Sequence, residues 1–279
     1  MISFIGAGKV GSALGVYFKQ KGQQIAGYYS RNHQHAFDAS RLTDSTAFAD
    51  IEELLMQSSM VWITVTDDAL GLVAEEIAKL EIPNHIKAFI HTSGVHSSNA
   101  LKAIENKGYA TYSAHPLMAF GSIDESVMQL NDVYFSMDTH ANQECNDYLS
   151  VFFENIGNKT LSINSEKKEL YHCAASVLSN YLVTLVNMSY EMFEAAGMSR
   201  SDIKKATAPL LQSTLKNIAE HDTMKDALTG PIKRGDKTTI IKHLKAIEKY
   251  MPSKSALYNE LGKGTMEMLH DYELKSIFS

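Results

Sequence analysis

The chain has 279 residues, of which 26 are Lys or Arg and 32 are Asp or Glu, so its formal net charge is −6. At roughly 150 residues per domain, this length suggests about two domains. The acidic balance lacks the concentrated positive field that binds a phosphate backbone, so nucleic acid is not expected as a partner. With 44% hydrophobic and 21% charged residues, the composition is that of a globular protein rather than a disordered or coiled-coil chain.

Cysteine usage and apolar runs indicate where the protein works. Cys145 and Cys173 are too few for a disulfide scaffold or a multi-cysteine metal site, and no metal is expected. The longest mostly apolar run, 173–186, is shorter than the roughly 18 residues that a membrane span needs. The N-terminal residues lack the basic and long apolar regions of a signal peptide. We therefore expect a cytoplasmic protein that is not inserted in a membrane.

The first part of the chain alternates β-rich runs with amphipathic stretches. Such alternation is typical of a parallel sheet with helices on both faces. It predicts the α/β class and a doubly wound Rossmann-type, mostly parallel sheet in residues 1–164. The expected strands are 2–5, 24–29, 60–66, 87–91, 110–113, 133–137 and 159–163, and the expected helices are 9–21, 50–57, 68–80, 98–107 and 142–155.

From residue 165 onward, only helical periodicity broken by turn signals is found. Residues 165–279 are therefore expected to form an all-α domain. No flexible linker separates the two parts, so we expect them to pack closely around a cleft that holds the substrate.

A glycine motif follows the first expected strand and opens the first expected helix. Gly6 permits a tight turn, Gly8 lets the backbone approach a pyrophosphate, and Gly11 allows close packing of the helix on the sheet. The free N–H groups of the first helical turn would bind the anion. The alternative is a glycine-rich turn that binds nothing. The expected cofactor-binding residues of this turn are Gly6, Ala7, Gly8, Lys9, Val10 and Gly11.

The end of the second expected strand indicates which dinucleotide is bound. An acidic residue there would bind a ribose 2′-hydroxyl, whereas an Arg would accept a 2′-phosphate. Residues 28–32 contain no carboxylate, and Ser30 and Arg31 offer a hydroxyl and a guanidinium group. NADP is therefore favoured over NAD, and a methyltransferase that uses S-adenosylmethionine is disfavoured. The alternative for Arg31 is a solvated surface charge.

Further polar residues follow two other expected strands. Thr66, Thr92 and Ser93 lie where the carboxyl ends of parallel strands reach a ligand crevice, and we expect them to line the nicotinamide end of the cofactor. For Asp67 and Asp68, helix N-capping is the favoured interpretation for at least one of the two.

Two of the eleven histidines are candidates for acid–base chemistry. His115 ends a strand and is held extended by Pro116, and His172 begins a long apolar helix. Hydride transfer to a C=O or C=N bond needs a partner proton, which a histidine exchanges near neutral pH. We hypothesise that His172 or His115 performs this step.

The helix that begins near His172 carries a stripe of small polar residues. At about 100° per residue, Ser176, Ser179 and Asn180 fall on the face of His172, and the opposite face is apolar, as in a helix buried in a bundle. Because residues 170–190 contain no Lys, Arg, Asp or Glu, an occluded polar cleft is favoured over a solvent-facing stripe. Ser176 is then a substrate-binding candidate, and Asn180 would position the substrate.

A third cluster spans residues 227–236. Arg234 is the candidate for binding an anionic group of the substrate. Asp236 has a purely structural alternative as the cap of the next helix.

Five segments of the chain carry specific motifs: G-A-G-K-V-G at 6–11, H-T-S-G at 91–94, H-P-L at 115–117, Y-H-C-A-A-S-V-L-S-N at 171–180 and L-T-G-P-I-K-R-G-D at 228–236. Together, they resemble the Rossmann-like proteins with a DUF2520 C-terminal domain, which are related to pyrroline-5-carboxylate reductase and to the 6-phosphogluconate dehydrogenase-like superfamily. The resemblance implies an NADP-dependent oxidoreductase-like protein whose helical domain mediates homodimerisation.

Broader relatives help only in part. The β-hydroxyacid dehydrogenases place a catalytic Lys four residues before an Asn on this helix, but here His172 and Ser176 fall at what look like these places. Lys167 and Lys168 lie a turn earlier, so the lysine mechanism is not carried over. The H-P-L segment is similar to the H-P-M motif of prephenate dehydrogenases, whose histidine contacts the reacting hydroxyl, which supports His115.

The sequence thus predicts an NADP-dependent reductase or dehydrogenase for a small, anionic C=O or C=N substrate. The alternative is a noncatalytic NADP(H)-binding sensor, in which cofactor occupancy alters domain closure or dimer contacts.

Overall fold

The computed structural model describes residues 1–139, 143–270 and 277–278. The chain divides into two compact units, Met1–Ser179 and Asn180–Ser279, here called the first and second unit. The first unit is built on an eight-stranded sheet with the order β3-β2-β1-β4-β5-β6-β7-β8. Its strands are β1 (Ile2–Ile5), β2 (Ile25–Tyr29), β3 (Thr46–Ala47), β4 (Met60–Ile63), β5 (Ala88–His91), β6 (Thr111–Pro116), β7 (Tyr134–Thr139) and β8 (Lys159–Asn164).

Most neighbouring strands of this sheet are parallel, as the sequence predicts. The pairing of β6 with β7 is antiparallel, with His115 directly opposite Ser136, and β8 is again parallel to β7. The carboxyl ends of β1, β4, β5 and β6 consequently meet at one edge of the sheet, where doubly wound folds bind their ligands.

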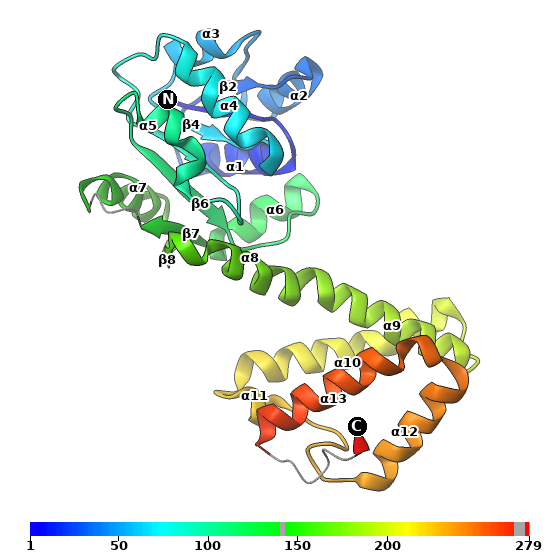
Figure 1. Cartoon of the computed structure of the whole chain (residues 1–279). Helices are drawn as coiled ribbons and strands as arrows, with labels where there is room; N and C mark the ends of the chain where they lie inside the picture. Colours follow the sequence, from blue (N-terminus) through cyan, green and yellow to red (C-terminus); the bar gives the residue numbers. More distant parts are fainter. Residues whose placement is uncertain (140–142, 271–276, 279) are drawn as a thin grey trace. The chain divides into compact units, whose positions relative to one another are not determined.

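Helices cover both faces of the sheet (Figure 1). Side chains of neighbouring positions pack on opposite faces, so that Phe4 and Trp62 join one apolar cluster while Ile5 and Val61 join the other. The first cluster includes residues of α1 (Lys9–Gln20), α2 (His33–Thr43), α6 (Ile123–Gln129) and α7 (Gln143–Ile156), and the second those of α3 (Ile51–Met56), α4 (Asp67–Lys79), the 3₁₀ turn Ser98–Leu101 and α5 (Lys102–Glu105).

Three elements of this unit are missing from the sequence prediction. Helix α2 is polar on average, and it begins where the Asn32 side chain accepts a hydrogen bond from the Gln34 amide. Helix α6 and strand β3 are too short for a clear periodicity. Asn142, the first residue of a predicted helix, lies outside the described residues.

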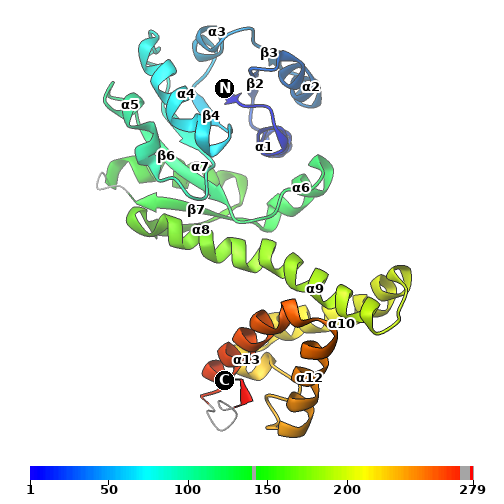
Figure 2. The ribbon, with the colours of Figure 1, turned by 45° about the vertical axis from the view of Figure 1, so that its right-hand side comes forward.

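After β8 and the 3₁₀ turn Ser165–Lys167, the chain enters α8 (Lys168–Ser176), a π-helical segment (Val177–Tyr181) and α9 (Leu182–Ala195). The boundary between the units falls within this run rather than at 164/165, because α8 packs on the sheet beside β7 (Figure 2). The π-helical segment also corrects the predicted helical wheel. An extra residue per turn rotates every later side chain, so Asn180 does not keep its predicted angle to His172.

The second unit is helical, as predicted. Helix α9 packs on α10 (Arg200–Glu220), and α12 (Lys237–Tyr250) packs on α13 (Ser255–Leu269), with the short α11 (Met224–Ala227) against α10 and α13. Its apolar cluster is small and centres on Ile240, Met266 and Phe278. None of the described helices is both long and apolar enough to cross a membrane.

One expectation about burial is wrong for the single chain. The apolar face of the α8–α9 run is predicted to be buried, but Leu178 is 75% exposed, and Val177 and Tyr181 are also exposed. A helix in a self-contained bundle would cover such side chains.

Candidate functional site

Packing fixes two glycines of the turn between β1 and α1. Gly6 has a φ of 105°, and a Cβ there would lie 2.7 Å from the Thr64 carbonyl carbon. A Cβ at Gly11 would collide with the Gly6 carbonyl oxygen and the Thr64 hydroxyl. Thr64, which directly follows β4, donates a hydrogen bond of 2.7 Å to the Gly6 carbonyl. Thr64 therefore holds the turn in place, a role that the sequence analysis missed.

The remaining glycine of the motif, Gly8, has open space where a side chain would lie. A Cβ at Gly8 would meet no heavy atom within 4 Å. Gly8 is the N-cap of α1, it provides no side-chain cap, and the first turn of the helix contains no acidic residue. The positive end of the helix dipole is therefore open to an anion, which fits the pyrophosphate of a dinucleotide.

The residues expected to choose between cofactors lie next to this turn. The Gly6 amide donates a hydrogen bond of 2.8 Å to the carbonyl of Tyr29, the last residue of β2. Ser30 and Arg31 follow directly, with Ser30 half-buried and Arg31 exposed. This segment offers a hydroxyl and a guanidinium group, and residues 28–32 contain no carboxylate that would bind a ribose 2′-hydroxyl.

The loops after β4 and β5 lie at the same sheet edge. Thr66 is the N-cap of α4, so the predicted capping by Asp67 or Asp68 is wrong; both are in the first turn, where acidic side chains stabilise the helix dipole. Thr92 is half-buried. The Ser93 hydroxyl accepts hydrogen bonds from the amides of Val95 (3.3 Å) and His96 (3.0 Å), so Ser93 closes its own loop.

His91 fixes the loop after β5 through hydrogen bonds that involve both nitrogens of its ring. Its Nε2 donates to the Ser97 carbonyl at 3.0 Å, since a carbonyl only accepts, and its Nδ1 accepts from the Ser93 amide at 3.2 Å. Burial, reinforced by the nearby Lys168 charge, lowers the pKa of His91 to about 3. His91 is thus a neutral structural residue that fixes the shape of the H-T-S-G segment.

His115 is bonded to helix α8 on one side of its ring. Its Nδ1 and the Tyr171 hydroxyl form a hydrogen bond of 2.9 Å, and the single proton of the Ser136 hydroxyl is shared between the Tyr171 hydroxyl at 2.8 Å and the His115 carbonyl at 3.2 Å. Burial, followed by the charge of Lys168, lowers the pKa of His115 to about 4. The imidazole is therefore neutral at physiological pH and fixed in orientation.

His172 lies next to His115. The two ring centres are 6.0 Å apart, with the rings nearly perpendicular. A Cβ at Gly94 would collide with Nδ1 of His172 and lie 3.0 Å from Nε2 of His115, so only glycine fits between them without displacement. Nδ1 of His172 is buried and has no hydrogen-bond partner in the described part of the chain.

The structure adds Lys168, which the sequence analysis set aside. Its side chain is 1% exposed, and its Nζ donates a hydrogen bond to the buried Ser113 hydroxyl. Burial lowers the pKa of Lys168 to about 8, against the opposing effect of Asp138 and Asp67. The signal was present in the sequence, because Lys168 lies four residues before His172 and hence on the same helical face.

A buried carboxylate completes a polar layer that comprises Ser113, His115, Ser136, Asp138, Lys168, Tyr171 and His172. Oδ2 of Asp138 accepts hydrogen bonds from the Ser98 amide (2.6 Å) and hydroxyl (3.1 Å), whereas its Oδ1 has no partner among the described residues. Along β6 and β7, the side chains that join the apolar cluster are Tyr112, Ala114, Phe135 and Met137, and those that alternate with them are Ser113, His115, Ser136 and Asp138. The sheet thus turns an apolar face to its core and a polar face to α8.

The remaining predicted residues are at the end of α8 or in the second unit. Ser176 ends α8 in the first unit, whereas Asn180 and Arg234 belong to the second unit. Arg234 is exposed in the loop before α12. Asp236 is the N-cap of α12, with its Oδ1 accepting from the Thr239 amide at 3.0 Å, so the structural alternative holds for it.

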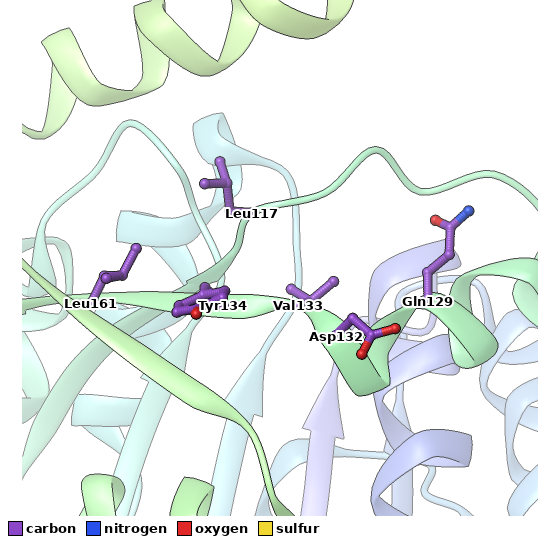
Figure 3. A pocket seen from close by; sticks show the side chains of 6 residues that line it. All are labelled: Leu117, Gln129, Asp132, Val133, Tyr134 and Leu161. Carbon is purple, nitrogen blue, oxygen red and sulfur yellow. The ribbon is translucent and has the colours of Figure 1, made fainter. Parts of the chain in front are cut away.

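Two pockets are lined by residues other than His115 and His172. One, of about 400 Å³, is next to the segment that follows His115 (Figure 3), and a second, of about 880 Å³, lies among α9, α12 and α13. Neither contains a residue of the polar layer. No group of three or more His, Cys, Asp or Glu that could hold a metal is found in the described ranges. The first pocket is lined by Leu117, Gln129, Asp132, Val133, Tyr134 and Leu161.

Solved structures with the same fold are found across nearly the whole chain. Protein TM1727 from Thermotoga maritima has a TM-score of 0.75 and 23% identity, covering 96% of this chain and 98% of its own. BF3122 from Bacteroides fragilis, described as a candidate NADP oxidoreductase, has a TM-score of 0.73 and 21% identity, covering 95% and 97%. Plasmodium falciparum pyrroline carboxylate reductase with NADP bound has a TM-score of 0.61 and 16% identity, covering 96% and 94%.

Sequence families agree with these likenesses. No curated protein matches the chain. The Rossmann-like domain family matches residues 1–116, and DUF2520, a domain of unknown function, matches residues 133–265. The resemblance drawn from the motifs is confirmed: a Rossmann-like domain model and a DUF2520 domain model match successive parts of the chain.

Proposed function

We propose that the protein is an NADP-dependent oxidoreductase, a reductase or dehydrogenase, that acts on a C=O or C=N bond of a small anionic substrate. One observation carries this proposal. The open glycine turn at Gly8 follows β1, and the neutral, oriented His115 lies at the carboxyl end of β6, so both are at the sheet edge where the carboxyl ends of the parallel strands meet, within a single unit. The names of two structural neighbours, an NADP oxidoreductase and an NADP-bound reductase, support the choice of cofactor.

Different residues of the chain bind different parts of the cofactor. The N–H groups of the turn at 6–11 bind the pyrophosphate, and Ser30 with Arg31 binds the 2′-phosphate. Thr66, Thr92 and Ser93 line the nicotinamide end. When bound, the cofactor supplies or accepts a hydride.

The histidines handle the proton. In the dehydrogenase direction, the neutral His115 accepts the proton that the substrate releases; in the reductase direction, His115 returns to the substrate a proton taken up from solvent. His172, next to it, is the second candidate for this proton transfer. Ser176, Asn180 and Arg234 remain proposed substrate contacts, with Arg234 for the anionic group.

The test combines cofactor binding with turnover. Purified protein should bind NADPH and oxidise it in the presence of a member of an imine, 2-oxo acid or aldehyde panel. His115→Gln or His172→Gln should reduce turnover by about 10²- to 10⁴-fold while sparing NADPH affinity. His221→Gln, at an exposed position of the second unit, is the matched control.

Two results would contradict the proposal in different ways. Failure to bind either nicotinamide cofactor would remove the dinucleotide site. Tight NADPH binding without oxidation over the whole panel would favour the sensor, in which cofactor occupancy changes conformation without chemistry.

We also propose that the protein is a homodimer through its helical part. Large apolar side chains are exposed on α9 and α10 of the single chain, including Val183, Leu210 and Leu215. Large apolar side chains exposed on a single chain favour an interface, and a two-fold dimer would cover them with a second copy of the same helices. Light scattering should give twice the chain mass of 30.9 kDa; a monomer at micromolar concentration would contradict this.

A further inference from the structure

The polar face of β6 and β7 contains a cation in an unusual place. Lys168 lies in the first turn of α8, and its ammonium group is covered by the sheet and bonded to Ser113. Burying an ammonium group costs free energy that an apolar side chain of the same length would avoid. A buried lysine whose neighbours are other titratable groups is therefore a candidate for a functional role.

Its neighbours indicate what that role is. Lys168, Tyr171 and His172 are spaced i, i+3 and i+4 on one helical face, and this face meets the strand face that carries Ser113 and His115. Lys168 is fully covered, so it does not touch a substrate itself. Any effect of its charge on chemistry must pass through a group that is less buried, and His115 is such a group.

We propose that Lys168 is a positioning residue whose buried ammonium group keeps His115 uncharged, so that His115 presents a neutral Nε2 edge to the substrate. Tyr171 completes the arrangement by bonding to Nδ1, which leaves Nε2 on the side of Gly94. The inference depends on the proposed function only in giving His115 a substrate to face.

The electrostatic surroundings agree with this assignment. Around His115 lie Lys168 and His172 from α8, which oppose its protonation, and Asp67 from α4, which favours it. Tyr171 is also in contact, and burial raises its pKa, so it stays neutral. Asp138 on β7, with Asp67, favours the charged form of Lys168. The pKa of His115 is lowered to about 4, with burial as the first cause and Lys168 as the second.

The experiment is an NMR titration of the full-length protein with ring-labelled histidine. The His115 signal is assigned by its loss in His115→Gln. In the wild type, His115 should remain neutral at pH 6, with its Nδ1 and Nε2 shifts those of a single neutral tautomer. A wild-type His115 that titrates in the ordinary histidine range would overturn the proposal without any variant.

Variants of Lys168 then test whether its positive charge affects the titration of His115. Lys168→Met should shift the His115 titration to higher pH, whereas Lys168→Arg, which keeps the charge, should leave His115 neutral at pH 6. Lys167→Met, which removes the neighbouring exposed charge, is the matched control and should cause no shift. An unchanged His115 titration in a folded Lys168→Met protein overturns the proposal. If that variant does not fold, Lys168→Gln replaces it with the same two outcomes.

The readout separates this inference from the proposed function. His115 can be observed in the cofactor-free protein, so a failed NADPH assay does not alter the titration result. Conversely, an active enzyme whose His115 is charged at pH 6 would retain the proposed function and reject the role of Lys168.

Discussion

The two units of the chain bury their apolar side chains to different degrees. In the first unit, helices cover both sheet faces, and side chains as large as Trp62 and Phe153 are fully buried. In the second unit, the apolar cluster is small, and Leu210 on α10 is 61% exposed. The first unit therefore buries most of its large apolar side chains within itself, whereas the second presents apolar surface that a further copy of the chain could cover.

The largest effect should come from the core of the first unit. Trp62 packs against Phe18 with ring centres 5.1 Å apart and lies near Phe152 and Phe153. Trp62→Ala should lower the free energy of unfolding by about 3–5 kcal/mol, because it leaves a cavity among these rings. Urea unfolding followed by circular dichroism measures the loss. A cost below about 1 kcal/mol would mean that this core is loosely packed.

The next effect concerns cofactor choice and assigns it to the first unit. Arg31→Glu should remove a charge-assisted contact of about 1.5–3 kcal/mol and weaken NADPH binding by about 10- to 100-fold, with little effect on NADH. Arg234→Glu makes the same change at an exposed position of the second unit and should leave the affinity for both cofactors unchanged. Calorimetric titration gives all four affinities. Equal losses for NADPH and NADH in Arg31→Glu would contradict the phosphate assignment.

Acid should affect the first unit before the second. The folded-state pKa values of His91 and His115 are lowered from 6.5 to about 3 and about 4, so below pH 6.5 the unfolded chain binds more protons than the folded one. Stability should then fall as the pH drops, by at most about 1.4 kcal/mol per pH unit for each histidine, until the folded-state pKa is reached.

The single tryptophan makes this measurable, because Trp62 reports only on the first unit. Its fluorescence should change at a higher pH than the far-ultraviolet circular dichroism signal, which includes the helices of the second unit. His115→Gln should make the fluorescence transition less steep with pH. Coincident transitions for both signals would show that acid does not distinguish the units.

The smallest effect sharpens the comparison at the exposed face. At protein concentrations low enough for a single chain, Leu210→Ala should change stability by no more than about 0.5 kcal/mol, since the side chain is largely exposed. At higher concentrations the variant should lose stability relative to the wild type, because the dimer that covers Leu210 is weakened. An effect that does not depend on concentration would argue against Leu210 as an interface residue.

Sequence periodicity predicted the sheet, its helical layers and the helical second unit, because long amphipathic runs leave a clear pattern. It missed α2, which starts at a capping Asn32 and has little apolar periodicity. It also placed His172, Ser176 and Asn180 on one regular helical wheel, and the π-helical turn at Val177–Tyr181 has no periodicity of its own from which it could be inferred.

The candidate site was predictable in part. The glycine turn and the two histidines follow from motifs whose spacing has a physical reason, and the structure brings His115 and His172 together. Lys168 and Asp138 were missed because charged residues are usually expected in solvent, and their burial depends on which strand face α8 covers. The alternation of Ser113 with His115, and of Ser136 with Asp138, was the available signal for a polar strand face.

The reversed direction of β7 has a consequence for how the protein can diverge. Ser136 sits mid-strand, paired in register with His115 on one side and with Leu161 on the other. Ser136, which contacts the Tyr171 hydroxyl that bonds to the imidazole, is therefore placed by a ladder whose spacing the backbone sets, and not by a connecting segment. Changes in the length or sequence of the neighbouring loops can thus alter which molecules reach the imidazole without changing the orientation of its ring.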